Sequence, residues 1–219
     1  MANLAVIVPY TKKSFWTLEE SKGISAQMDM IKSKYGAFVN QSARLSNVLP
    51  EIIISTIAIE SAGDKNAVSA SGARGLMQLI PSSANDILIM ENVKQRLTDG
   101  EKAVLRKRMG SRLDQLLKMK YLGDPKANAG KINFVTAADL SDPEFNIQVG
   151  TIFLGLLIDE EKEGGTTRLD RVVVRYNKGY FSKMDRSKTV EQNLATAKAE
   201  TKAYILKMGG LNGTMDLLT

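Results

Sequence analysis

The chain has 219 residues, of which 43% are hydrophobic and 25% are charged, values typical of a globular protein with one good-sized core. It contains no cysteine and no histidine, which excludes disulfides, thiolate nucleophiles, Ser-His and Cys-His triads and the commonest zinc ligand. Acid–base chemistry near neutral pH therefore falls to Glu, Asp, Lys or Tyr. The net charge of +6 suits an anionic partner such as nucleic acid, a membrane surface or bacterial wall polymer, without choosing among them.

Residues 1–35 are predicted to form an N-terminal arm and the beginning of a helix. Residues 1 to about 20 read as irregular, with a short strand favoured at 5–8. This arm lacks the basic start and the long apolar run of a signal peptide. No segment reaches the roughly 18 apolar residues of a transmembrane helix. A helical pattern follows from about residue 24 to residue 47.

The run from residue 49 to Glu60 predicts a buried helix that ends in a carboxylate. Pro50 suits the first turn, because its missing N–H is not needed there. Five isoleucines cover almost every face, so the helix should be buried on most sides. Burial raises the pKa of a carboxyl group, and a protonated carboxylic acid can protonate a leaving group. Glu60 is therefore the candidate general acid, although a solvated Glu or a pair with Lys65 is the simpler alternative.

The middle of the chain carries glycines and then basic residues. Residues 62–80 read as loops or a small hairpin, and Pro81 starts another helix. From about 91 to 126, basic residues outnumber acidic ones, while Leu and Met recur at helical spacing. Two interpretations stay open: a helical hairpin with one packed side and one solvated basic side, or a patch that grips an anionic polymer.

The last third of the chain reads as helical. Asp142 and Pro143 are typical of a helix start, and Gly164 and Gly165 are expected to end that helix. A helix through residues 168–175 is predicted to run into the segment 176–179, and a final helix covers roughly 190–208. The predicted fold class is mainly α (α+β), with a minor β element.

Five short motifs occur in order along the chain. They are Glu60-Ser61, the block from Ala67 to Gln78, Asn-Ile-x-x-Gly at 146–150, Tyr-Asn-Lys-Gly at 176–179, and Glu-Thr-Lys-Ala-Tyr-Ile at 200–205. In this order they resemble the lytic transglycosylases of the soluble-transglycosylase, goose-lysozyme-like group. The resemblance covers roughly residues 36–84 and 139–208. It implies a lysozyme-like domain over residues 36–219, with a basic helical subdomain inserted at about 87–134.

The resemblance also implies a substrate and a set of site residues. The substrate would be the β-1,4 bond between N-acetylmuramic acid (MurNAc) and N-acetylglucosamine (GlcNAc) in peptidoglycan, cleaved to a 1,6-anhydro end. Glu60 would act as general acid and then as general base, with no metal or organic cofactor. Tyr176 would orient the N-acetyl group of the substrate. The other residues assigned to substrate binding or to the support of the cleft are Ser69, Met77, Gln78, Asn146, Asn177 and Glu200. For Met77, Asn146 and Glu200 a purely structural role stays open.

The motifs depart from the family pattern at three positions. Phe153 stands where the family has Tyr, and Arg175 and Lys178 replace the two alanines around Tyr176. Both replacements are bulky and charged, so the sugar subsites near them are expected to differ from the family norm.

Other functions and locations follow from the same residues. A true lysozyme would use the same site with water in place of the C6 hydroxyl, and a non-catalytic wall-binding or structural component would keep the fold without turnover. Nucleic-acid binding by the insertion is disfavoured, because its basic residues are not interleaved with stacking aromatics. Without a signal peptide, the chain resembles tail-associated bacteriophage virion enzymes that act on the host wall. The arm or the insertion would then dock to other virion proteins. The alternative is an endolysin held in the host cytoplasm until release.

Overall fold

The computed structural model describes residues 5–6, 10–119, 134–182 and 185–218, and in these ranges it is mainly helical, as the sequence predicts. The predictions for residues 1–4, 7–9 and 120–133 lie outside the described residues. Within the described ranges, no helix is both long enough and apolar enough to span a lipid bilayer.

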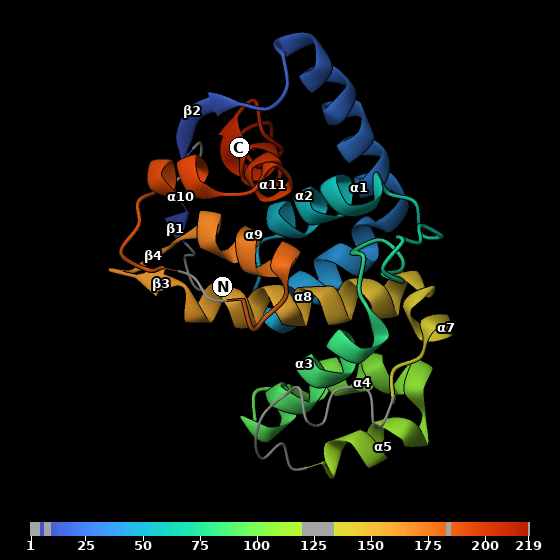
Figure 1. Cartoon of the computed structure of the whole chain (residues 1–219). Coiled ribbons are helices and arrows are strands. Elements are labelled where there is room, and N and C mark those ends of the chain that lie inside the picture. The colour runs from blue at the N-terminus through green and yellow to red at the C-terminus, as the bar shows by residue number, and fades with distance from the viewer. Residues whose placement is uncertain (1–4, 7–9, 120–133, 183–184, 219) are drawn as a thin grey trace.

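Helix α8 (Pro143–Glu160) runs through the middle of the molecule, and the other helices pack above and below it (Figure 1). It contacts α1 (Leu18–Ser46), α3 (Pro81–Val93), α4 (Asp99–Met109), α7 (Ala137–Leu140) and α9 (Leu169–Lys178). Asp142 caps its N-terminus by accepting a hydrogen bond from the N–H of Phe145 at 2.9 Å, as predicted. A side chain at Gly150 would collide with Met77, so the small residue there lets the loop before α3 approach α8 closely.

Helix α2 (Pro50–Ser61) begins at Pro50, as predicted, and lies between α1 and α11 (Ala199–Gly209). Ile52, Ile53 and Ile57 are fully buried, which confirms that most faces of this helix are covered. Helix α11 packs on both α2 and α9, and it thereby closes the region around the C-terminal end of α2.

Three helix boundaries differ from the prediction. Helix α1 begins at Leu18, because Thr17 and Glu20 form a capping box that the apolar pattern does not reveal. Helix α8 ends at Glu160, and two glycines at positive φ, Gly164 and Gly165, instead turn a hairpin of β3 (Lys162–Glu163) and β4 (Thr166–Thr167). The last predicted helix is two helices, α10 (Val190–Thr196) and α11, with extended backbone between them. No glycine or proline marks that break, so the helical pattern alone does not locate it.

The short strand favoured at 5–8 is present at residues 5–6, and residues 11–14, predicted to be irregular, form a second strand. Strand β1 (Ala5–Val6) pairs in parallel with β4, and β2 (Thr11–Ser14) pairs in parallel with β5 (Gly210–Leu211). The N–H of Tyr10 donates to the carbonyl of Gly209 at 3.0 Å, and its hydroxyl donates to the carbonyl of Ile205. The arm is therefore fastened to the last helix of the chain.

Helices α4 and α5 (Ser111–Leu117) form most of the described part of the basic segment. Their apolar side is packed, since Leu105, Leu113 and Leu116 are fully buried. Their basic side is largely paired with acidic groups: Arg106 with Asp114, Lys107 with Glu144, and Arg108 and Arg112 with Asp139. Pairing reduces the positive charge open to an anionic polymer, which favours the packed hairpin interpretation. The division into a lysozyme-like domain and an insertion stays a prediction.

Candidate active site

Glu60 lies in the last turn of α2, where the apolar helix meets the loop of residues 67–79. The residue after the helix, Ala62, has a left-handed conformation with φ of 54°, so the chain turns sharply there. The hydroxyl of Ser61 donates to the carbonyl of Leu76 at 2.7 Å and accepts from the N–H of Gly63 at 3.2 Å. The end of the helix is thereby tied to the loop, and the position of Glu60 is fixed.

Burial raises the pKa of Glu60 from its usual value of 4.5 to about 7. The hydroxyl of Tyr204 donates to Oε1 of Glu60 at 2.8 Å and opposes this rise, since it favours the ionised form. The negative charge of Glu200 raises the pKa further, and the positive charge of Lys207 lowers it. Near neutral pH the carboxyl group is therefore present in both protonated and ionised forms.

Glu60 forms part of the wall of a cavity of about 680 Å³, a size typical of ligand sites. Five other predicted site residues line the same cavity: Ser69, Gln78, Tyr176, Asn177 and Glu200. They come from the 67–79 loop, from α9 and from the first turn of α11. The fold thus brings together six of the eight residues that the sequence singles out.

The loop of residues 67–79 presents Ser69 and Gln78 to this cavity. The hydroxyl of Ser69 accepts a hydrogen bond from the N–H of Ala73 at 3.0 Å, which closes the tip of the loop. The side-chain amide of Gln78 donates to the carbonyls of Ala67 and Gly75 at 3.1 and 3.0 Å. Both side chains therefore brace the loop as well as facing the cavity, so their positions are set before a substrate binds.

Met77 and Asn146 are fully buried, and neither lines the cavity. The side chain of Asn146 accepts from the N–H of Met77 at 2.8 Å and donates to the carbonyls of Arg74 and Leu140, each at 2.9 Å. These bonds fasten the loop to α8. For Asn146 this geometry favours the structural role that the sequence left open, and for Met77 it agrees with the predicted support of the cleft.

Tyr176 is buried in α9 and touches the cavity with part of its ring. The ring stacks on Phe153, with centroids 4.9 Å apart, and its hydroxyl donates to the carbonyl of Met77 at 2.9 Å. Asn177, next to it, is half-buried on the cavity wall. Glu200 is exposed, and its negative charge acts on the site by raising the pKa of Glu60. Substrate contacts by these residues stay predictions.

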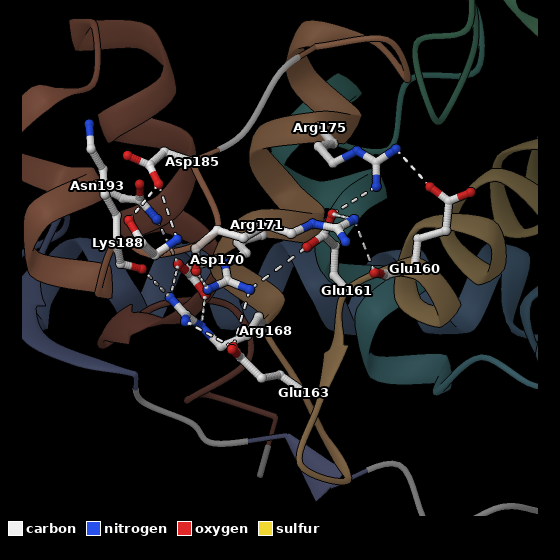
Figure 2. Close-up of polar contacts among 12 residues, drawn as sticks. Glu160, Glu161, Glu163, Arg168, Asp170, Arg171, Arg175, Asp185, Lys188 and Asn193 are labelled. Atoms are coloured by element: carbon white, nitrogen blue, oxygen red, sulfur yellow. Dashed lines mark hydrogen bonds and ion pairs between the residues drawn. The ribbon is translucent and has the colours of Figure 1, made fainter.

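Arg175 does not enter the cavity, contrary to the expectation that it changes a sugar subsite. Figure 2 shows its guanidinium directed toward two carboxylates at the end of α8. It donates to Glu161 and to Glu160, each at 2.8 Å, and its cation lies 5.0 Å from the ring centroid of Tyr180. Tyr180 itself lines the cavity, so Arg175 shapes the site only through the wall it supports. Lys178, the other replacement, does line the cavity.

Tyr204 and Asp86 bring acid–base groups to the site, although the sequence does not assign either residue to it. Tyr204, the hydrogen-bond donor to Glu60, sits in the 200–205 motif, so the motif carries a signal for it. Asp86 of α3 lines the cavity, and burial raises its pKa, but Asp86 belongs to none of the five motifs. Within the described residues, no group of three or more acidic side chains is placed to hold a metal ion.

Residues 37–129 match the family described as Transglycosylase SLT domain. The matched segment contains Glu60 and the loop that carries Ser69 and Gln78, whereas Tyr176 and Tyr204 reach the site from beyond it through the packing of α9 and α11. The segment 37–129 is thus similar to the SLT domain of lytic transglycosylase enzymes, and this match implies lytic transglycosylase activity on peptidoglycan.

Proposed function

We propose that this protein cleaves the β-1,4 bond between MurNAc and GlcNAc and leaves a 1,6-anhydro-MurNAc end, with Glu60 as the only acid–base group. The observation that carries the proposal is the state of Glu60: a desolvated carboxyl group on the wall of a ligand-sized cavity, with a pKa of about 7. A group whose pKa lies near the working pH serves equally well as proton donor and proton acceptor.

In the first step the protonated Glu60 gives its proton to the glycosidic oxygen. The bond between that oxygen and the anomeric carbon of MurNAc breaks, and the GlcNAc side leaves as an alcohol. In the second step the Glu60 carboxylate removes the proton of the MurNAc C6 hydroxyl, whose oxygen bonds to the anomeric carbon. The proton is back on Glu60 at the end, and no water is consumed. One carboxyl group therefore serves both steps.

The surroundings of Glu60 suit this double role. Tyr204 occupies Oε1, so we assign the proton transfers to Oε2. Burial also raises the pKa of Tyr204 well above 10, so this hydroxyl stays a donor in both steps. Between the steps the site must stabilise a positive anomeric centre. We assign that role to the acetamido group of the substrate itself, oriented by Tyr176, which lines the same cavity.

The test is a peptidoglycan digest analysed by mass spectrometry, with wild type beside Glu60→Gln and Asp86→Asn. Asp86 is the matched control because it is a second carboxyl group on the same cavity wall. We expect anhydro-muropeptides from wild type and from Asp86→Asn, and none from Glu60→Gln.

Other products would change the assignment. Fragments heavier by one water would identify a hydrolase, and their loss in Asp86→Asn would make Asp86 the base that activates water. Anhydro products from Glu60→Gln would refute the role of Glu60. The location in a phage virion and the docking role of the arm stay predictions, since the site chemistry is the same in either location.

A further inference from the structure

Glu60 borders a second hollow, of about 510 Å³, in addition to the cavity described above. Glu60 and Gln78 are the two residues that the hollows share, so the hollows meet at the candidate general acid. The wall of the second hollow includes Trp16, Gln27 of α1 and Lys207 of α11. Trp16 and Gln27 lie before residue 37, outside the segment that matches the transglycosylase family.

The arm holds Trp16 in a fixed place. Strand β2 ends two residues before Trp16 and is paired with β5, and the capping box of α1 begins directly after it at Thr17. In Figure 1 this stretch crosses from β2 to the free end of α1, on the far side of α2 from α3. The ring of Trp16 packs edge-on against Phe15 with centroids 5.6 Å apart, and the Lys207 ammonium lies 4.8 Å from the Phe15 centroid. Trp16 is half-buried, so part of its ring remains open to the hollow.

We propose, resting on the function proposed above, that the second hollow holds the sugars on the leaving side of the cleaved bond, with Trp16 as their stacking wall. The acid protonates an oxygen that joins two sugars, so the glycan must continue on both sides of Glu60. Tyr176, assigned to the reacting MurNAc, lines only the first cavity, which leaves the second hollow for the departing GlcNAc.

The chemistry of the second hollow suits a sugar. Trp16 offers a large apolar ring with one N–H donor, which matches the C–H face and the hydroxyl groups of a pyranose. The amide side chains of Gln27 and Gln78 supply donors and acceptors for the hydroxyls and the acetamido group. A cleft that is open on both sides of the acid binds the interior of a glycan strand, and the arm completes the leaving-side half.

Trp16 is the only tryptophan of the chain, so its fluorescence reports on this hollow alone. The experiment titrates inactive Glu60→Gln with a purified octasaccharide of alternating GlcNAc and MurNAc, followed in parallel by fluorescence and by titration calorimetry. We expect the tryptophan emission to change and to saturate at the same dissociation constant that the heat gives.

Matched variants on the Glu60→Gln background separate contact from folding. Trp16→Ala should weaken octasaccharide binding by about tenfold, as the loss of a buried aromatic contact does, and Trp16→Phe should recover most of it. Phe15→Ala removes a neighbouring ring that does not line the hollow and should change binding by less than about twofold. Thermal unfolding of each variant checks that the arm remains folded.

The outcomes distinguish this inference from the proposed function. Heat of binding without a change of tryptophan emission would overturn the role of Trp16 and leave the proposed function intact. Equal losses for Trp16→Ala and Phe15→Ala would also overturn it, because the effect would then come from the arm as a whole. No binding heat, together with no products from wild type, would overturn both proposals.

Discussion

Two carboxyl groups of this molecule have similar hydrogen-bond partners, but their pKa values are shifted in opposite directions. Glu60 accepts a hydrogen bond from the hydroxyl of Tyr204 and lies near Lys207, and its pKa is raised to about 7. Glu160 accepts a hydrogen bond from the hydroxyl of Tyr180, also at 2.8 Å, and its pKa is lowered. Burial raises the pKa of both groups, so burial alone does not explain the difference.

The two pKa shifts differ because a cation contacts Glu160 directly. Arg175 donates to Glu160 at 2.8 Å, and Lys94 adds a second contact at 3.3 Å, so burial is outweighed there. Lys207 acts on Glu60 only as the weakest of the causes that set its pKa, and Glu200 opposes it. A tyrosine and a weakly acting lysine thus leave the pKa of Glu60 raised, whereas a guanidinium in contact helps to lower the pKa of Glu160. The first arrangement suits the acid–base role proposed for Glu60, and the second suits an ion pair that stabilises the fold.

The largest effect we expect is on stability, from removal of the cation that Glu160 has and Glu60 lacks. Arg175→Met keeps the side-chain volume but removes the 2.8 Å partner of Glu160 and of the fully buried Glu161, which keeps only Arg186 at 3.2 Å and Arg171 at 4.0 Å. Removing the main partner of a buried charge costs up to about 3 kcal/mol. We expect the free energy of unfolding in urea to fall by about that amount.

Lys94→Met is the matched control for Arg175→Met. It removes the other cation that contacts Glu160. The side chain of Lys94 is 42% exposed, and such surface pairs contribute less than about 1 kcal/mol. Equal losses for the two variants would mean that the buried pairs of Arg175 do not hold this part of the fold.

The second effect is a dependence of stability on pH that has opposite signs for the two carboxyl groups. Folded Glu60 titrates near pH 7 and the unfolded group near 4.5, so between these values the folded state binds more protons. The loss of folding stability caused by ionised, desolvated Glu60 is absent below about pH 4.5, grows as the pH rises and is complete above pH 7. Glu60→Gln cannot ionise, and we therefore expect it to be more stable than wild type by about 1–3 kcal/mol at pH 8 and equal to it at pH 4.

Glu160→Gln should behave in the opposite way. Because the folded pKa of Glu160 is lowered, its ionised form stabilises the fold above its unfolded pKa, and this contribution is lost as the pH falls through the folded value. The variant should therefore be less stable than wild type at pH 8, and the gap should narrow in acid. Urea unfolding at both pH values measures this, and the same sign for both variants would refute the comparison.

The sequence predicts the burial of Glu60 better than it predicts the residues that contact Glu60. Pro50 and the five isoleucines give α2 and the burial of its last turn, because local pattern and capping determine both. The motifs also bring Ser69, Gln78, Tyr176 and Asn177 to one cavity. The partners that set the pKa of Glu60 were not predicted, since Tyr204 and Lys207 lie about 145 residues away and reach it only through the packing of α11 on α2.

Long-range pairing also explains the errors. The sequence predicts that Arg175 changes a sugar subsite. Nothing in its own helix shows that its guanidinium donates hydrogen bonds to two carboxylates at the end of α8. The part of the arm that forms β2 reads as irregular, because this strand is short and its partner β5 is almost 200 residues later. Trp16 therefore gains a place beside Glu60 only when the chain ends are paired.

The smallest effect we expect concerns the two tyrosine hydroxyls that donate to the compared carboxyl groups. Tyr204→Phe removes a bond to the ionised form of Glu60, so the pKa of Glu60 should rise above about 7, by up to about one pH unit. Because the first step needs protonated Glu60, the rate falls as the pH rises through this pKa. In Tyr204→Phe that fall should begin at higher pH, measured as kcat/KM for peptidoglycan lysis.

Tyr180→Phe is the matched control for this shift. It removes the equivalent hydroxyl from Glu160, which takes no part in the proposed proton transfers. Tyr180 lines the cavity, so the variant can change KM, but the pH at which the rate falls should stay that of wild type. A shift of that pH in Tyr180→Phe, or its absence in Tyr204→Phe, would show that the fall reports a group other than Glu60. A shift confined to Tyr204→Phe would instead assign it to Glu60, because each variant removes one hydroxyl from one carboxylate.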